Sequence, residues 1–173
     1  MRLTLCFYPP YKAPASTGEA ADIANRWANE NLRGHRAGVW PRVATMTALI
    51  SHTSFDSLDA HAMSVFWGKV LGFTEDPDNP DEPGDEECMI FSADGAQRLL
   101  FIEVPDAKQV KNRLHLDLMP AEGTRDEELE RLLGLGARTV DDRRLPDGSG
   151  WVVLADPEGN EFCILRNDAE RAN

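Results

Sequence analysis

Four side chains of types that ligate metal ions lie in four separate strand-like segments of this sequence: His52, Glu103, His115 and Cys163. Each His opens one half of the region 47–167, and Glu103 or Cys163 lies in the segment that closes the same half. Imidazole, carboxylate and thiolate are common protein ligands of divalent transition metals. If the two halves pack face to face, the four groups meet in one pocket. The sequence therefore predicts a candidate site for zinc, iron, nickel or manganese.

The elements that must position these residues repeat along the chain in the order strand, helix, strand, strand, strand. In the first half, apolar periodicity and turn signals predict the clearest of them at residues 49–55, 60–71, 88–92 and 97–104. In the second half they are predicted at residues 112–118, 124–135, 137–141, 151–155 and 161–166. His52 precedes Gly72 by 20 positions and His115 precedes Gly136 by 21. Two similar modules that pack together are therefore expected.

Both predicted helices have start, stop and packing signals. Thr124 and Glu127 have the spacing of a capping box, and Gly72 and Gly136 are typical of helix C-termini. The expected inward residues are Met63, Phe66, Trp67, Val70 and Leu71 in the first helix and Leu129, Leu132 and Leu133 in the second. Trp151 is expected in the core with Phe66 and Trp67, rather than as a platform for a ligand.

Alternation along the strands predicts which other side chains accompany the candidate ligands. Ser54 and Asp56 share the side of His52, and Asp117 shares the side of His115, because successive strand residues point to opposite faces. These three residues are therefore expected to line the pocket. The side that faces the helix in the second half is expected to hold Leu114, Leu116 and Leu118.

The last strand-like segment places Glu161 on the same side as Cys163. Glu161 is the candidate catalytic base. The alternative is a structural Glu161 that caps a turn or forms an ion pair outside the pocket. Cys163 also has an alternative role, as a small buried apolar residue.

Composition excludes several classes of partner. The formal net charge is −12, which disfavours nucleic acid and anionic membranes because both would repel the chain. Three cysteines without a CxxC spacing predict no disulfide framework and favour a reduced, cytoplasmic setting. No apolar run has the roughly 20 residues that a membrane span needs.

The chain is expected to divide into three parts. Residues 1–45, which are punctuated by prolines and glycines, are predicted to form a loosely ordered N-terminal extension. The alternative is an arm that packs through Trp27 and Trp40. Residues 46–167 form the predicted domain, and residues 168–173 a loose tail.

Three segments, at residues 66–73, 111–118 and 151–164, resemble the vicinal oxygen chelate superfamily of glyoxalases, bleomycin-resistance proteins and dioxygenases. Within it, the chain looks most like the glyoxalase-like domain branch, which is common among bacterial proteins. The resemblance implies an α+β fold in which paired βαβββ modules form a curled mixed sheet around a cleft. It also implies pairing of modules between chains, so a homodimer is expected.

The resemblance places His52, Glu103, His115 and Cys163 at the four positions where the superfamily's enzymes hold a divalent metal. Glyoxalase I enzymes have at the fourth position a Glu that is both ligand and catalytic base. A thiol at Cys163 suits zinc as a ligand but is not the same base, so lactoylglutathione lyase activity is not expected.

Two functions follow as expectations. The first is a protein that binds a small molecule in the cleft between its modules as a divalent-metal-dependent lyase, isomerase or dioxygenase. Glu161 or a metal-bound water would then be the base. The alternative is a metal-free protein that sequesters a hydrophobic or cationic small molecule without catalysis, as bleomycin-resistance proteins do. A scaffold with a vestigial pocket is the third possibility.

Overall fold

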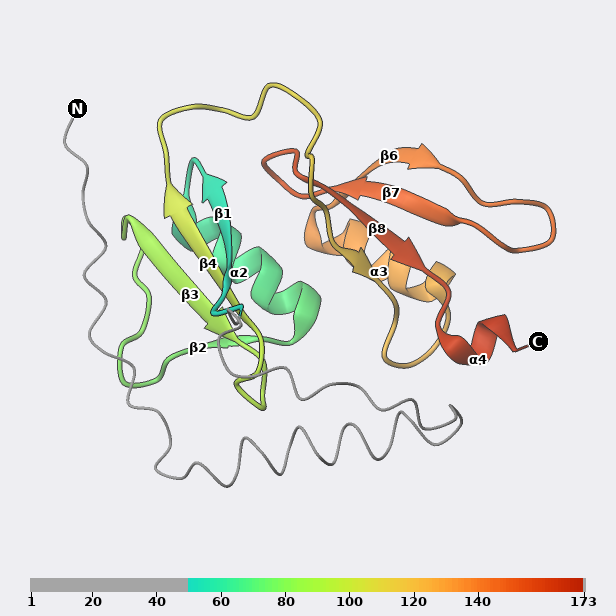
Figure 1. The fold of residues 1–173 in the computed structure, drawn as a ribbon, viewed down its shortest axis with the longest axis horizontal. Coiled ribbons are helices and arrows are strands. Elements are labelled where there is room, and N and C mark those ends of the chain that lie inside the picture. The colour runs from blue at the N-terminus through green and yellow to red at the C-terminus, as the bar shows by residue number, and fades with distance from the viewer. Residues whose placement is uncertain (1–49, 173) are drawn as a thin grey trace, which may run out of the picture. The chain divides into compact units, whose positions relative to one another are not determined.

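The computed structural model describes residues 50–172 (Figure 1). The predicted extension over residues 1–45, with its alternative of an arm anchored by Trp27 and Trp40, lies outside the described residues. The domain boundaries given above therefore stay predictions.

The first module contains β1 (Thr53–Ser57), α2 (Ala60–Leu71), β2 (Thr74–Glu75), β3 (Glu87–Phe91) and β4 (Arg98–Glu103). Its strands form a mixed sheet in the order β1-β4-β3-β2, in which β1 is parallel to β4 and β3 is antiparallel to both of its neighbours. The long β2–β3 connection is rich in acidic residues, as is typical of a solvated loop.

The second module repeats this order with β5 (Asp117–Leu118), α3 (Arg125–Leu135), β6 (Arg138–Asp142), β7 (Trp151–Ala155) and β8 (Glu161–Leu165). Its sheet has the equivalent strand order β5-β8-β7-β6, with β5 parallel to β8. The predicted α+β class and the paired βαβββ modules are confirmed.

Capping residues start and end both long helices as predicted. The side chain of Asp59 accepts a hydrogen bond of 2.8 Å from Ala62 N at the start of α2. Thr124 and Glu127 form the expected capping box at the start of α3. Gly72 and Gly136 end the two helices with φ of 68° and 110°, a left-handed conformation that suits glycine.

One cluster of buried apolar residues joins both helices to one face of each sheet. Trp67 of α2 lies at its centre, with its ring centroid 5.6 Å from that of Phe55 on β1 and 5.1 Å from that of Phe162 on β8. Each helix packs against its own sheet, and α2 also contacts α3. The helices therefore lie on the inner side of the two sheets (Figure 1). On the opposite face of each sheet, which we call its open face, no helix of residues 50–172 lies.

The structure corrects several local expectations. Trp151 is 39% exposed and Leu114 is 77% exposed, so neither is a core residue. In β7 it is Val152 and Leu154 that point into the core, which leaves Trp151 on the open face. Leu133 is 40% exposed, because the buried stripe of α3 is narrower than expected.

The largest differences from the predicted elements are at the first strand, at the strand of the segment 112–118 and in the tail. The first strand begins at Thr53 and extends to Ser57. Only Asp117–Leu118 is strand within the predicted segment 112–118. The expected loose tail instead forms the helical turn α4 (Asp168–Arg171), because Asn167 and Glu170 make a capping box there.

Candidate functional site

The open face of the second sheet brings several candidate residues together. Asp117 on β5 is in register with Cys163 on β8, which in turn is in register with Val153 on β7. Paired residues of neighbouring strands point to the same face, so these three side chains lie side by side. Phe162 and Ile164 point to the other face and belong to the core.

His115, Asp117 and Cys163 form a compact group of possible metal ligands on this face. Each offers one ligand atom such that all three atoms lie within 4.8 Å of one another. His115 Nε2 is 3.4 Å from Asp117 Oδ1. Burial, reinforced by a hydrogen bond to Asp117, raises the pKa of the Cys163 thiol to about 11. Without a metal, Cys163 is therefore a protonated thiol at neutral pH.

A pocket of about 280 Å³ contains part of this group. Its lining comes from β6, β7, β8 and the segment before β5: Lys111, His115, Val140, Asp141, Arg143, Trp151, Val153, Glu161 and Cys163. The pocket thus combines exposed apolar side chains with charged groups, as small-molecule sites commonly do.

Glu161 is held by two neighbours. Its Oε2 lies 2.9 Å from Lys108 Nζ and accepts a 3.0 Å hydrogen bond from Asn112 N. Partial burial raises the pKa of Glu161, but the bonds from Asn112 and Lys108 outweigh this effect and hold the pKa below its ordinary value. Glu161 is therefore an ionised carboxylate with both bonds on the same oxygen, Oε2, and its lowered pKa makes it a weak base.

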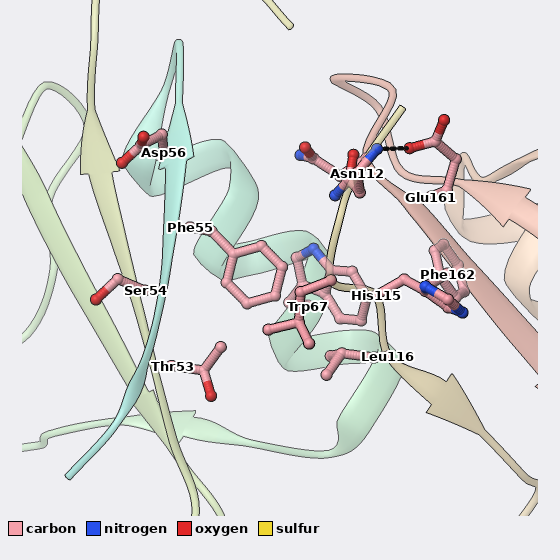
Figure 2. A pocket seen from close by; sticks show the side chains of 12 residues that line it. Thr53, Ser54, Phe55, Asp56, Trp67, Asn112, His115, Leu116, Glu161 and Phe162 are labelled. Atoms are coloured by element: carbon pink, nitrogen blue, oxygen red, sulfur yellow. Dashed lines mark hydrogen bonds between the residues drawn. The ribbon is translucent and has the colours of Figure 1, made fainter. Parts of the chain in front are cut away.

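The residues expected from the first module do not line the open-face pocket. Ser54 and Asp56 instead line the junction crevice with His115, and His52 lines a separate pocket with Asp117. Ser54 and Asp56 are exposed on the open face of β1, where they are in register with Leu100 and Ile102. Figure 2 shows both side chains pointing away from Trp67. His52 precedes β1, and its Nδ1 lies 3.1 Å from Ser51 Oγ.

Glu103 is separated from His52 within the same sheet. It pairs with Ser57 at the far end of the parallel β1–β4 ladder, whereas His52 precedes the start of that ladder. Strand alternation also places Glu103 on the face of Phe101, which points to α2. Of the four candidate ligands, the structure thus brings together His115 and Cys163, and it places neither His52 nor Glu103 beside them.

A crevice of about 200 Å³ lies between β1 and the segment that leads into β5 (Figure 2). Phe55, Trp67 and Phe162 form its floor, and Asn112 and Glu161 lie at its edge. His115 and Glu161 line both this crevice and the open-face pocket. The crevice is the junction between the modules and has a mainly aromatic floor.

A profile of the glyoxalase-like domain family matches residues 52–165. The chain belongs to this family. The match confirms the resemblance to the vicinal oxygen chelate superfamily. A search of curated protein sequences gave no significant match.

Solved structures share the glyoxalase-like fold. A mutant of the fosfomycin resistance protein FosX from Listeria monocytogenes, complexed with Mn(II) and 1S,2S-dihydroxypropylphosphonic acid, is 19% identical with a TM-score of 0.52. That likeness covers 69% of this chain and 90% of the FosX chain. FosX from Mesorhizobium loti is 18% identical with a TM-score of 0.51, over 73% of this chain and 98% of its own. At these identities the likeness concerns the fold.

The glyoxalase-like turn Asp156–Asn160 joins the two modules. Asp156 is fully buried and accepts a 3.2 Å hydrogen bond from Trp67 Nε1 of α2. Glu158 accepts hydrogen bonds of 2.8–3.0 Å from Leu58 N and Asp59 N at the start of the same helix. This turn, which carries much of the family resemblance, therefore fixes the position of α2 rather than contributing a ligand to the open face.

The sequence analysis missed four residues around the open-face pocket: Lys108, Lys111, Arg143 and Trp151. Alternation along β7 already pairs Trp151 with Val153 on one face, so the signal for Trp151 was present. For the three cationic residues there was no periodic signal, because they lie in connections and at a strand end.

None of the helices in the described part of the chain is both long and apolar enough to cross a membrane.

Proposed function

We propose that this glyoxalase-like domain protein binds a small molecule on the open face of its second sheet, and that two copies of the chain complete the site. The observation that carries the proposal is the open-face pocket, where His115, Glu161 and Cys163 meet Trp151 and Val153. Small-molecule sites typically combine an apolar lining with a few converging polar groups.

The need for a second copy follows from the direction of the open faces. Both helices pack on the inner sides of the sheets, so the open faces turn away from each other within one chain. Ser54 and Asp56 share the junction crevice with His115 in one chain, but no residue of the first module lines the open-face pocket around Cys163. A second copy would bring the open face of its first sheet, with His52 beside it, to that pocket. Pairing of modules between chains, which the superfamily resemblance implies, supports a homodimer of this kind.

A metal-dependent lyase, isomerase or dioxygenase is the second candidate, and one observation favours it. The imidazole, carboxylate and thiol of His115, Asp117 and Cys163 are a donor set that suits zinc, and they lie within 4.8 Å of one another. A metal held there would act as a Lewis acid on a substrate oxygen. The Mn(II) in the Listeria FosX structure supports a divalent metal in this fold. Of the predicted partner ligands, the geometry supports His52 from the second copy and does not support Glu103.

Glu161 has a positioning role in either case. Its carboxylate forms an ion pair with Lys108 and accepts a hydrogen bond from the backbone N–H of Asn112. Asn112 belongs to the segment that leads into β5. This arrangement orients His115 relative to Cys163. We assign this positioning role in place of the predicted role as base, because the lowered pKa makes the carboxylate a poor proton acceptor.

Metal content separates the two candidates. The protein would be purified without chelator or affinity metal, alongside the variant His115→Ala and the control His61→Ala, which changes a His of α2 that lies outside the pocket. Near-stoichiometric zinc, iron, nickel or manganese that only His115→Ala loses would establish the metal-dependent candidate. No metal in the wild-type protein, even after these ions are added, would exclude it and leave metal-free binding.

A reassortment experiment tests the two-copy site. Variants His52→Ala and His115→Ala would be unfolded together and refolded, and a ligand found by fragment screening would be titrated by calorimetry. Random pairing yields about half hybrid dimers, each with one intact site, so roughly a quarter of wild-type binding capacity is expected. A mixture that binds no more than either variant alone, or a wild-type chain that binds as a monomer, would overturn the two-copy site.

A further inference from the structure

The carboxylates of the open-face pocket are already neutralised by the protein. Glu161 pairs with Lys108 at 2.9 Å, and Asp141 Oδ2 lies 2.7 Å from Arg143 Nε. Each acidic group therefore has a cation of its own within hydrogen-bonding distance. The pocket gains no net attraction for a cationic ligand from these two residues, because each pair is neutral as a unit.

Lys111 is the remaining charge of the pocket lining. It is exposed, it lines the pocket with Cys163, and its positive charge lowers the pKa of that thiol, although burial dominates the shift. Among residues 50–172 no ion pair within 4.0 Å involves Lys111. Among the residues that line the pocket, the charge without an ion pair is therefore positive, in a chain whose net charge is −12. Asp117, which lies beside Cys163, is outside this lining and faces His115 at 3.4 Å.

A flat apolar wall lies next to this charge. Trp151 and Val140 are 39% and 56% exposed. Val153 follows Trp151 on the same face of β7 and is in register with Cys163 on β8. An indole ring on an open sheet face offers a planar surface on which another ring can stack. The apolar wall and the unpaired ammonium line the same pocket of about 280 Å³.

We infer that the ligand of this pocket is an anion with a flat apolar body, of the aromatic carboxylate class. This inference rests on the proposed small-molecule function and names its ligand class. Lys111 pairs with the acidic group, which is a charge-assisted interaction, and Trp151 stacks on the ring. The inferred anionic class replaces the cationic class in the expectation of a hydrophobic or cationic ligand, because both acidic residues of the pocket lining are paired.

The test uses three probes of the same shape and different charge: 2-naphthoate, 2-naphthamide and 2-naphthylmethylamine. Each would be titrated by calorimetry into the full chain, and the side-chain indole signal of Trp151 would be followed by NMR. We expect 2-naphthoate to bind about 10-fold more tightly than the neutral amide, the typical worth of one charge-assisted hydrogen bond. The amine should bind most weakly of the three.

Two lysine variants then test whether Lys111 causes the preference for 2-naphthoate. Lys111→Gln should abolish the 10-fold advantage of 2-naphthoate and leave the affinity for 2-naphthamide unchanged. Lys69→Gln makes the same change of charge on the exposed side of α2, outside the pocket, and should alter neither affinity. Trp151→Ala should weaken all three probes, because each stacks through the same ring.

The outcomes test the anionic ligand class separately from the proposed small-molecule site. Tighter binding of the amine or the amide than of 2-naphthoate, with a shifted Trp151 signal, would overturn the anionic class and leave the small-molecule site standing. Equal weakening of 2-naphthoate by Lys111→Gln and Lys69→Gln would also overturn the anionic class. If none of the probes bound or shifted Trp151, the pocket itself would be refuted as a binding site, and this inference with it.

Discussion

Each module has a hairpin turn before its last strand, and an aspartate in each turn accepts hydrogen bonds from a different set of partners. In the first module, Asp94 accepts hydrogen bonds from Ser92 Oγ at 2.6 Å and from Ala96 N at 3.0 Å, so its bonds stay within the turn. In the second module, Asp156 accepts bonds from its own turn and also one from Trp67 of the other module. Turns at corresponding places in a duplicated fold thus differ when only one of them faces the other module.

The same divergence applies to the open faces. The second sheet collects His115, Asp117 and Cys163 within reach of one another. On the first sheet, His52 and Glu103 lie at opposite ends of the β1–β4 ladder and on opposite sides. The first module therefore supplies the aromatic and helical surface of the junction, and the second supplies the pocket with the converging polar groups.

The largest expected effect is a loss of stability on substitution of Asp156 but not of Asp94, the aspartates of the two turns. Asp156→Ala should lower the free energy of unfolding by about 3 kcal/mol, because it leaves the buried Trp67 Nε1–H and the backbone N–H groups of the turn without their acceptor. Urea denaturation followed by circular dichroism would measure it. Asp94→Ala is the matched control in the exposed turn and should be close to wild type.

The variant Trp67→Phe tests the hydrogen bond between Trp67 and Asp156 from the donor side. It keeps most of the aromatic packing with Phe55 and Phe162 but removes the donor to Asp156, so it should destabilise the domain by part of the Asp156→Ala effect. If the double variant lost as much stability as the sum of the single variants, the Trp67–Asp156 bond would not be the link between the modules.

A smaller effect is expected at the second contact of the same turn. Glu158→Gln keeps the shape of the side chain but removes its negative charge. The wild-type carboxylate accepts hydrogen bonds from Leu58 N and Asp59 N at the start of α2. A loss of about 1 kcal/mol is expected, since a carboxylate at a helix N-terminus is stabilising. Thermal unfolding at low and high salt would measure it. Glu130→Gln on the exposed side of α3 is the control, and an equal loss there would argue against the role of Glu158.

The smallest effect concerns the two buried thiols. Burial raises the pKa of Cys88 to about 12, with Asp81 and Asp85 adding to it, and burial raises the pKa of Cys163 to about 11. Because both native values exceed the 9.0 of an ordinary thiol, the native state holds these protons more tightly than the unfolded state. Their contribution to stability is therefore complete below pH 9 and decreases as the pH rises toward 11 and 12.

Alkylation with iodoacetamide compares the two thiols directly. Both should react slowly at pH 8 in the native protein and quickly in urea, as read by mass spectrometry of the two peptides. Cys163 should react before Cys88, because Cys163 lines a pocket and Cys88 is a core residue. Faster reaction of Cys88 would contradict the assignment of Cys163 to an accessible pocket.

Much of the architecture could be predicted because local signals determine it. The helix Ala60–Leu71 and the strand Trp151–Ala155 have the predicted bounds, since apolar periodicity, the Asp59 cap and the terminal Gly72 agree there. The helix that begins after Thr124 was equally clear from its capping box. The strand β5 is shorter than predicted, because its ladder with β8 comprises only Asp117 and Leu118 although the alternation in the sequence begins earlier.

The candidate site could be predicted only in part. Alternation correctly placed Asp117 with His115, and Glu161 with Cys163, on one face of the second sheet. It could not reveal that Lys108 engages Glu161 or that Trp151 stands on the same open face as Cys163. Both facts depend on contacts between residues about 10 to 50 positions apart, which no local pattern encodes.

The amino-acid sequence alone was enough to predict two βαβββ modules of the glyoxalase-like kind, since caps, turns and apolar periodicity act over a few residues. Which faces of those modules meet depends on tertiary packing. The burial of Trp67 against Phe162 and the bond from Trp67 to Asp156 turn the helices inward and the open faces outward. That arrangement requires the packing of a whole core, and it determines which of the candidate residues share a pocket.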